Sequence, residues 1–392
     1  MYQSGCSGVN DTTSCEDTMN ISTSNITESD SGASSTEAPS MLIRFILETG
    51  ISMPLSCLGL IGNALAFMVL LRQRPRITTS IHLMALAVAD SWVLISTILL
   101  RSIRYIYYHM GYFKSYLDIY HYVFLALYPS LYFIRLVCTW LVVLLTVDRY
   151  IAVCHPLKAQ SSCTVNKARR NILILFVAAA LFSLPRYFEH RLDYTSKFKF
   201  HSTDLLKFKL YTVIYRVFVY LLVMYLFPMC ILVVLNAKLL SALRKAEKQR
   251  NEISGTPLKH SQGRSITAIV VIVVTLCIAS NTVALSSHLL WSLQLCFESM
   301  SSSVDLPRRY ISLVSNVLVT FNSAINFVIY VFFSRSFRSI LVQTCCFKKG
   351  AGYSTISGTV LRMGTMRSET SHVPCRRTEP KLLSDKASPI ML

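Results

Sequence analysis

The sequence holds seven long runs with few or no charged residues, and these runs restrict the chain to very few folds. A helix that crosses a bilayer needs roughly 20 apolar residues, and all runs but the fourth reach that length. Flanking residues out to Phe188 can complete the fourth. Because the runs are continuous and do not alternate, they favour helices over membrane-spanning strands. The runs are Thr49–Leu71, Ile77–Leu100, Ile119–Val147, Asn171–Pro185, Val217–Ala237, Ser265–Phe297 and Tyr310–Ser334.

These runs predict an all-α membrane protein with a seven-transmembrane helix bundle over residues 42–334. A short amphipathic helix over residues 335–346 is expected to lie on the membrane surface, in contact with lipid. Residues 1–41 are acidic and rich in Ser and Thr, and predict an extracellular disordered tail with glycosylation sequons at Asn10, Asn20 and Asn25. Residues 347–392 predict a cytoplasmic disordered tail. Cys345 and Cys346 precede two lysines and are candidate palmitoylation sites.

The charge of the chain is strongly basic, with 39 Lys and Arg against 20 Asp and Glu and a formal net charge of +19. Such a charge is also found in nucleic-acid-binding proteins. Here, however, the basic residues gather in the segments that follow the odd-numbered runs. Positive residues favour the cytoplasmic side of a membrane. The charge therefore predicts an outside N-terminus, an inside C-terminus and no nucleic-acid partner.

Polar residues inside the runs are costly in lipid and are therefore usually functional or paired. Asp148-Arg149-Tyr150 closes the third run, and Asn326-Phe-Val-Ile-Tyr330 lies near the end of the seventh. Arg149 is a permanent cation at a membrane boundary, where Asp148 beside it can neutralise it. The remaining polar or helix-breaking markers are Asn63 after Gly62, Asp90 at the end of Leu86-Ala-Val-Ala-Asp90, and Pro228 in the fifth run.

Taken together and in this order, the motifs make the chain similar to the rhodopsin-like (class A) G-protein-coupled receptors over residues 42–346. The stretches Leu184–Arg191, Pro228–Asn236 and Asn322–Tyr330 resemble the invertebrate FMRFamide-type neuropeptide receptors. The resemblance implies a plasma-membrane receptor with an extracellular peptide ligand, a heterotrimeric G protein as partner, and arrestin binding to a phosphorylated tail. It assigns coupling and activation to Asp148, Arg149, Tyr150, Pro228, Asn236, Asn326 and Tyr330. No nucleophile, metal cluster or phosphate loop is apparent, so no enzymatic activity is expected.

A buried polar network is expected around Asp90, because polar groups in the bundle must satisfy one another or hold water or an ion. Its other members are Asn63, Asn322, Ser323 and Asn326. The resemblance implies a structural sodium ion here and no other cofactor. Cys138, however, stands where the family usually has Ser, which puts sodium affinity in doubt. A plain polar packing network remains the alternative.

Two features depart from the family pattern. Phe124 stands at the expected place of a cysteine, and residues 186–209 contain no cysteine that could form the usual disulfide. Cys296 is expected outside, where it either pairs with Cys6 or Cys15 or stays free. In the sixth run, Cys277-Ile-Ala-Ser280 replaces the usual Cys-Trp-x-Pro, so the helix is expected to hinge near Ser280 and Asn281.

The ligand pocket implied by the resemblance lies on one face of the third run, formed by Tyr128, Leu131, Tyr132 and Arg135 at helical spacing. Leu131 replaces the Asp of amine receptors, and the seventh run lacks the retinal-linking Lys. An unpaired Arg deep in a bundle costs roughly 2.5–3.5 kcal/mol, so Arg135 needs a partner. The candidates are the ligand, an aromatic face such as Tyr132, carbonyl groups, or Asp90 through water. The other candidate ligand residues are Arg101, Arg104, Glu189, Arg216, Asn281, His288 and Asn316.

The class of ligand stays open at the level of sequence. An amidated, FMRFamide-like peptide carries an Arg and would favour acids, whereas the mouth of the predicted pocket is basic. An acidic peptide or a small carboxylate is therefore the alternative. A transporter or channel is disfavoured, because the chain shows no internal repeats and no broken helices with paired ionisable residues.

Overall fold

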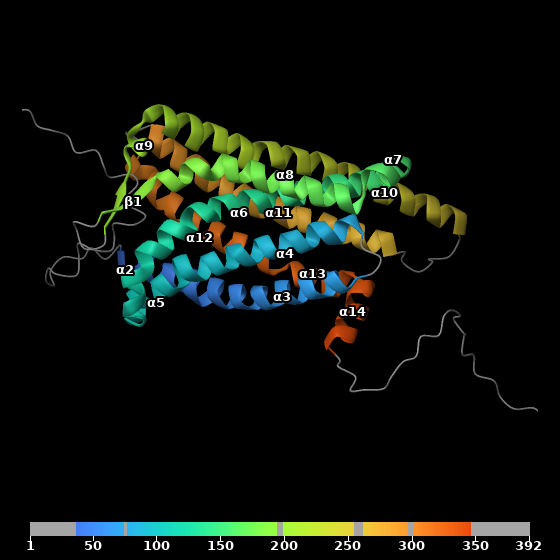
Figure 1. The fold of residues 1–392 in the computed structure, drawn as a ribbon, viewed down its shortest axis with the longest axis horizontal. Helices are drawn as coiled ribbons and strands as arrows, with labels where there is room; N and C mark the ends of the chain where they lie inside the picture. The colour runs from blue at the N-terminus through green and yellow to red at the C-terminus, as the bar shows by residue number, and fades with distance from the viewer. Residues whose placement is uncertain (1–36, 74–76, 194–198, 255–261, 297–300, 346–392) are drawn as a thin grey trace, which may run out of the picture. The chain divides into compact units, whose positions relative to one another are not determined.

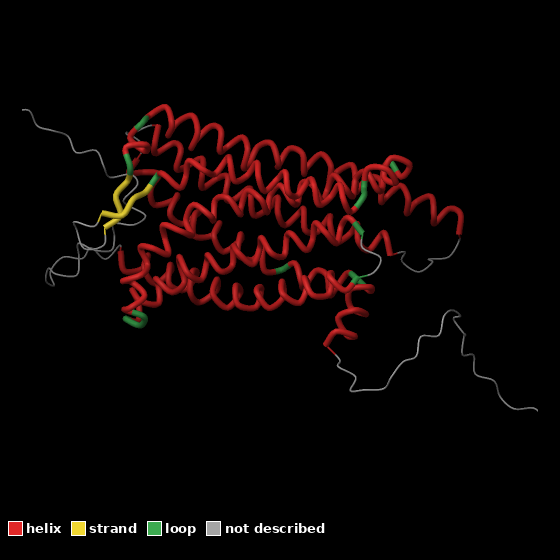
Figure 2. Tube along the Cα trace, viewed as in Figure 1, coloured by secondary structure: helices red, strands yellow, loops and turns green. Residues whose placement is uncertain are grey.

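The computed structural model describes residues 37–73, 77–193, 199–254, 262–296 and 301–345 (Figure 1). Within these ranges the chain is helical apart from one two-stranded hairpin and short connections (Figure 2). Several predicted sites lie outside the described residues: Asn10, Asn20, Asn25, Cys6, Cys15 and Cys346, together with the side chains of Cys296 and Cys345.

Six helices in the described part of the chain are long and apolar enough to cross a membrane, and a helix pair bent by 43° makes a seventh. The first three spans are α2–η2–α3 (Glu37–Phe45, Ile46–Ile51, Ser52–Arg72), α4–η3–α5 (Thr78–Thr97, Ile98–Ser102, Ile103–Met110) and α6 (Lys114–Cys154). After α7 (Pro156–Ser162), the fourth is α8 (Val165–Ser183) with the 3₁₀ turn η4 (Leu184–Phe188).

The hairpin of β1 (His190–Asp193) and β2 (Lys199–Ser202) is antiparallel, and α9 (Asp204–Lys207) follows it. The fifth span is η5–η6–α10 (Tyr211–Val219, Leu221–Leu226, Phe227–Ser254), the sixth is α11 (Gln262–Cys296), and the seventh is α12–α13 (Ser301–Ala324, Asn326–Phe333). The short helix α14 (Arg335–Cys345) comes last. The predicted seven-helix, multi-pass architecture is confirmed.

Two spans begin earlier than their apolar runs. The fourth starts at Val165, because the Thr164 hydroxyl accepts a 3.4 Å hydrogen bond from the Lys167 N–H and caps the helix before its apolar part. The first starts at Glu37, within the segment expected to be a tail, and places Glu48 inside the bundle. Polar residues at a helix start are therefore compatible with a span.

The fifth and sixth spans differ in regularity. Pro228 has no N–H to bond the backbone one turn earlier, and two π-helical segments precede it, the second of which, η6, ends at Leu226. By contrast, α11 runs without a break past Ser280, whose hydroxyl donates to the Cys277 carbonyl at 3.1 Å. Such a bond competes with the helix backbone. The hinge near Ser280 stays a prediction.

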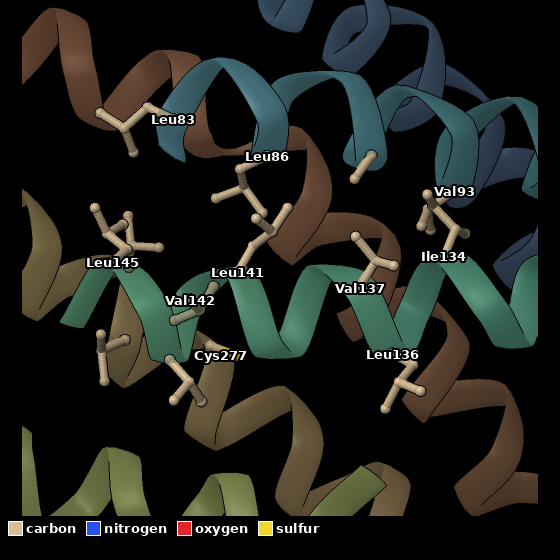
Figure 3. Packing of buried hydrophobic residues seen from close by; sticks show 14 of the residues in the cluster. Leu83, Leu86, Val93, Ile134, Leu136, Val137, Leu141, Val142, Leu145 and Cys277 are labelled. Carbon is tan, nitrogen blue, oxygen red and sulfur yellow. The ribbon is translucent and has the colours of Figure 1, made fainter. Parts of the chain in front are cut away.

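The helix α6 lies at the centre of the packing, in contact with α4, α8, α10 and α11. Figure 3 shows Leu86 of α4 facing Leu141 of α6, with Cys277 of α11 on the other side of α6. These residues belong to one buried apolar cluster that links the spans. The cluster fixes how each helix is rotated, and thereby which polar residues face one another.

Two glycines allow α3 to approach the seventh span closely. A Cβ atom on Gly59 would lie 2.6 Å from the Cβ of Ala324, and one on Gly62 would lie 2.9 Å from the Cβ of Phe327. Both distances are too short for real carbon contacts. Glycine at these positions therefore brings the first and seventh spans together below the cavity described next.

Candidate functional site

A cavity of about 380 Å³ opens at the end of the bundle that carries the β1–β2 hairpin. Its volume is typical of ligand pockets, which range over roughly 300–1,000 Å³. The third-span face expected from helical spacing does line it, and so do most of the other candidate ligand residues. Those lining residues are Arg101, Arg104, Tyr128, Leu131, Tyr132, Arg135, Arg216, His288 and Asn316.

Two candidate ligand residues are not part of this cavity. Asn281 lines a separate, smaller cavity beside Asp90, where its amide donates to the Cys277 sulfur at 3.2 Å. Glu189 is fully buried and lies behind the lining residues Arg186 and Arg216. The position of a residue along a span predicts how deep it lies in the bundle. It does not predict whether the side chain points into the cavity or away from it.

Arg135 lines both cavities and has no ion pair in the described part of the chain. Its Nη2 atom is buried and lacks a hydrogen-bond partner. The Tyr132 ring, considered above as its partner, is instead faced by Arg186, whose guanidinium carbon lies 4.4 Å from the ring centre. Arg135 is thus a half-buried cation without an ion pair in the described part of the chain, and its buried Nη2 atom is the part that lacks a partner.

The single Glu189 carboxylate pairs with two of the other cations. It lies 3.3 Å from Arg186 and 3.4 Å from Arg216, and all three side chains are less than a tenth exposed. The Tyr211 hydroxyl donates to the same carboxylate at 2.8 Å. One negative charge offsets one of these two positive charges, so this part of the wall keeps one net positive charge.

The cations on the other side of the mouth are also engaged. Asp305 pairs with Arg308 at 2.7 Å and with Arg309 at 2.6 Å. Arg104 donates to the Tyr120 hydroxyl at 3.3 Å, and its guanidinium lies over the Tyr120 ring. Asp305 offsets only one of its two arginines, and the Tyr120 hydroxyl carries no charge, so the lining of the cavity remains basic.

Glu48 is a cavity residue that the sequence did not reveal. Its side chain is 1% exposed, lines the cavity and accepts a 3.0 Å hydrogen bond from the Asn316 amide at Oε1. Its Oε2 atom has no partner within the described residues. In the sequence Glu48 is only a single acid immediately before the apolar run that begins at Thr49, and nothing there predicts that it lies inside the bundle.

The β1–β2 hairpin is held to α6 without the family's usual disulfide. Phe124, at the expected cysteine position, contacts the His190 ring edge-on at 5.9 Å, and Tyr128 contacts the same ring at 5.7 Å. Burial lowers the pKa of His190 below its ordinary value, which disfavours a charged ring at this contact. Aromatic packing and the Glu189 ion pairs thus replace a covalent link.

The polar network around Asp90 has the expected members. Asn326 donates to one Asp90 oxygen at 2.7 Å, Cys138 donates to the other at 3.7 Å, and Asn63 donates to the Ser323 carbonyl at 3.1 Å. The adjoining cavity, which Asn322 also lines, measures about 30 Å³, enough for a water molecule.

These residues fit a sodium ion poorly. Hard cations bind oxygen, whereas Cys138 offers sulfur and uses its S–H toward the Asp90 carboxylate. The Arg135 charge lines the same small cavity and opposes a second cation.

The opposite end of the bundle holds the expected coupling residues. Arg149 lies 2.9 Å from Asp148, and the Thr78 hydroxyl donates to the same carboxylate at 2.8 Å. Arg149 is therefore paired locally. The remaining residues link neighbouring elements: Tyr150 contacts His155 edge-on at 5.5 Å, Asn236 donates to Thr275 at 3.4 Å, and Tyr330 packs on Phe337 at 5.6 Å.

Comparison with known proteins agrees with this geometry. The family model for the 7 transmembrane receptor (rhodopsin family) matches residues 62–330. The chain is 28% identical to the FMRFamide receptor of Drosophila melanogaster over 73% of its own length and 51% of that relative. It is 27% identical to FMRFamide peptide receptor frpr-18 of Caenorhabditis elegans, over 57% and 53% of the two chains. It is 26% identical to neurotensin receptor type 1 of Rattus norvegicus, over 76% and 75%.

The chain spans about half the length of the first two of these relatives. The family match covers most of the seven-span bundle, with the Asp148–Arg149 pair and all of the cavity lining except Arg44 and Glu48. It also agrees with the expectation that the chain is a receptor and not an enzyme. The chain belongs to the rhodopsin family of seven-transmembrane receptors.

Proposed function

We propose that this chain is a plasma-membrane receptor for an amidated, FMRFamide-like neuropeptide and that it activates heterotrimeric G proteins. Its N-terminus would lie outside the cell, so that the cavity faces extracellular peptide. The relatives named as FMRFamide receptors support the ligand class. The single observation that carries the proposal is the unpartnered Nη2 atom of Arg135, buried at a 380 Å³ cavity.

An amidated peptide terminus suits the floor of this cavity. A buried guanidinium without a partner is costly, and a ligand carbonyl that accepts from Nη2 would remove that cost. Tyr220 and Tyr225 line the same floor, and their hydroxyls can accept from the N–H groups of a terminal amide. Arg135 would thus bind the carbonyl oxygen of the terminal amide, and the two tyrosines would bind its N–H groups.

Signal transfer is proposed to run through the Asp148–Arg149 pair. In the present arrangement Arg149 is held by Asp148 and Thr78. Ligand binding would favour a second arrangement in which the helices move apart and Arg149 turns toward the G protein. Pro228, Asn236, Asn326 and Tyr330 lie where the fifth and seventh spans would have to rearrange.

The surroundings of the bundle complete the proposal. We infer glycosylation at Asn10, Asn20 and Asn25, palmitoylation at Cys345 and Cys346, contact of α14 with membrane lipid, and arrestin binding to the C-terminal segment. We propose no resident cofactor, and we propose that the Asp90 cavity holds water in place of sodium, because Cys138 and Arg135 fit the ion poorly.

A second candidate ligand is an acidic peptide or a small carboxylate. Arg135, Arg44 and Arg101 all line the cavity and have no ion pair among the described residues, which favours an anionic group. The amidated peptide is preferred because two of the relatives are named FMRFamide receptors, and because Glu48 lines the cavity with an Oε2 atom that lacks a partner in the described part of the chain.

The test is a calcium assay in cells that express the receptor with a promiscuous G protein, challenged with amidated peptides, their free-acid forms and small organic acids. We expect a response to an amidated peptide that Arg135→Glu abolishes at unchanged surface expression. The matched control is Arg191→Glu, an exposed charge reversal outside the cavity. Silence to all amidated peptides with a response to an organic acid would refute the proposal.

A further inference from the structure

We infer that Glu48 and Asn316 form a subsite for the cationic group of the ligand, a guanidinium or an ammonium. This inference rests on the proposed function and goes beyond it, because it assigns which part of a peptide binds where. Glu48 belongs to none of the motifs on which the family resemblance rests, and it precedes the first apolar run, which begins at Thr49.

The carboxylate is built into its position. Asn316 from α12 donates to Oε1 at 3.0 Å, and the Ser102 hydroxyl from η3 donates to the Glu48 backbone carbonyl at 2.7 Å. Two neighbouring spans therefore hold this residue of the first span in place. A side chain that is 1% exposed and fixed from two sides is not a solvated surface acid.

The carboxylate is nevertheless incompletely satisfied. Oε2 is buried without a hydrogen-bond partner in the described part of the chain. The nearby cavity cations Arg44 and Arg101 do not come within ion-pair distance of it, and Arg104 bonds Tyr120 instead. A buried carboxylate that lacks a cation is costly. A ligand cation that enters the cavity would remove that cost.

The distance between Glu48 and Arg135 suits a short peptide. Glu48 is fifteen residues before Asn63, and Arg135 is three before Cys138, with both reference residues in the Asp90 network. At about 1.5 Å per helical residue, the two Cα atoms are separated by roughly 18 Å along the bundle. Extended chain covers about 3.5 Å per residue. The separation of the Cα atoms therefore equals about five extended residues, and the side chains of Glu48, Arg135 and the ligand cover part of it. A peptide that places its terminal amide at Arg135 would bring a basic side chain from its last few residues to Glu48.

The experiment measures peptide binding to purified full-length receptor, independently of G-protein signalling. The probes are Phe-Met-Arg-Phe-amide and the same peptide with citrulline in place of Arg, which keeps the shape and removes the charge. We expect the wild-type receptor to bind the Arg peptide roughly 30-fold more tightly, the size of effect typical of a buried charge pair. In Glu48→Gln this ratio should fall to about one, whereas Asp204→Asn, an exposed acid-to-amide control, should retain it.

Equal affinity of the wild type for both peptides would overturn the subsite but not the proposed function as a peptide receptor. This comparison uses the wild type alone. Retention of the full ratio in Glu48→Gln would overturn it as well. If neither peptide binds the wild type, the proposed function fails. The subsite is then decided by thermal stabilisation with Nα-acetyl-arginine amide, which should stabilise the wild type more than Glu48→Gln, and an equal effect on both would refute the subsite.

Discussion

The Glu189 carboxylate lies 3.4 Å from the Arg216 side chain and joins the segment that follows the fourth span to the fifth span. The same carboxylate binds Arg186, and neither arginine has solvent to compensate for its loss. In a receptor without the usual disulfide, this cluster carries the attachment of the hairpin above the cavity.

Glu189→Gln should therefore destabilise the receptor strongly. Removal of one partner of a buried ion pair leaves an uncompensated charge and costs about 3–5 kcal/mol. We expect a clear fall in the thermal unfolding midpoint of the purified receptor. Asp204→Asn breaks an exposed pair with Lys207 and should change stability by less than about 1 kcal/mol. Equal midpoints for the wild type and Glu189→Gln would contradict this view of the hairpin.

Gly59→Ala should disturb the packing of the first span on the seventh. The added Cβ would lie 2.6 Å from the Ala324 Cβ, so the helices must separate, and overpacking of this kind costs about 1–3 kcal/mol. We expect reduced surface expression and a lower unfolding midpoint. Gly50→Ala meets no atom within 4 Å and serves as the control. Identical behaviour of the two variants would show that the close approach is not required.

Sodium should have little effect on agonist affinity in the wild type, because Cys138 and Arg135 fit the ion poorly. We expect affinities within about twofold in sodium chloride and in choline chloride of equal ionic strength. Cys138→Ser supplies an oxygen to the Asp90 cavity and should introduce sodium sensitivity. A wild-type affinity that falls in sodium but not in choline would contradict the account.

Asp148→Asn should raise basal signalling. The substitution removes the charge that holds Arg149 at 2.9 Å, and a partly exposed pair of this kind contributes about 1 kcal/mol, or roughly fivefold in population. Ligand-free activity per receptor at the cell surface is the measurement. Thr78→Val, which removes only the hydroxyl that donates to Asp148, should give a smaller increase. Basal activity at the wild-type level in Asp148→Asn would argue against a restraining pair.

Much of the fold could be predicted because each span is encoded locally. Apolar length gave the seven helices, and helical spacing gave the face of Tyr128 and Arg135 that lines the cavity. The Asp90 network was accessible for the same reason, since polar residues in an apolar helix have few other partners.

The pairings between spans could not be predicted from spacing. Arg186 rather than Arg135 lies over the Tyr132 ring, and Glu189 forms an ion pair with Arg186 instead of facing the cavity. Both contacts depend on where the hairpin folds back over the bundle. Glu48 was missed because π-helical turns and a helix start before the apolar run carry it into the cavity. Such choices are set by three-dimensional packing, which also pairs four of the arginines around the cavity with two carboxylates.

Peptide-dependent nucleotide exchange on a purified heterotrimeric G protein by the reconstituted receptor tests the proposed function most directly. We expect an amidated FMRFamide-like peptide to accelerate exchange, and Arg135→Gln to reduce the potency of that peptide by at least about tenfold while basal exchange is retained. Absence of any peptide-dependent exchange by the wild type, or an unchanged potency in Arg135→Gln, would contradict the account.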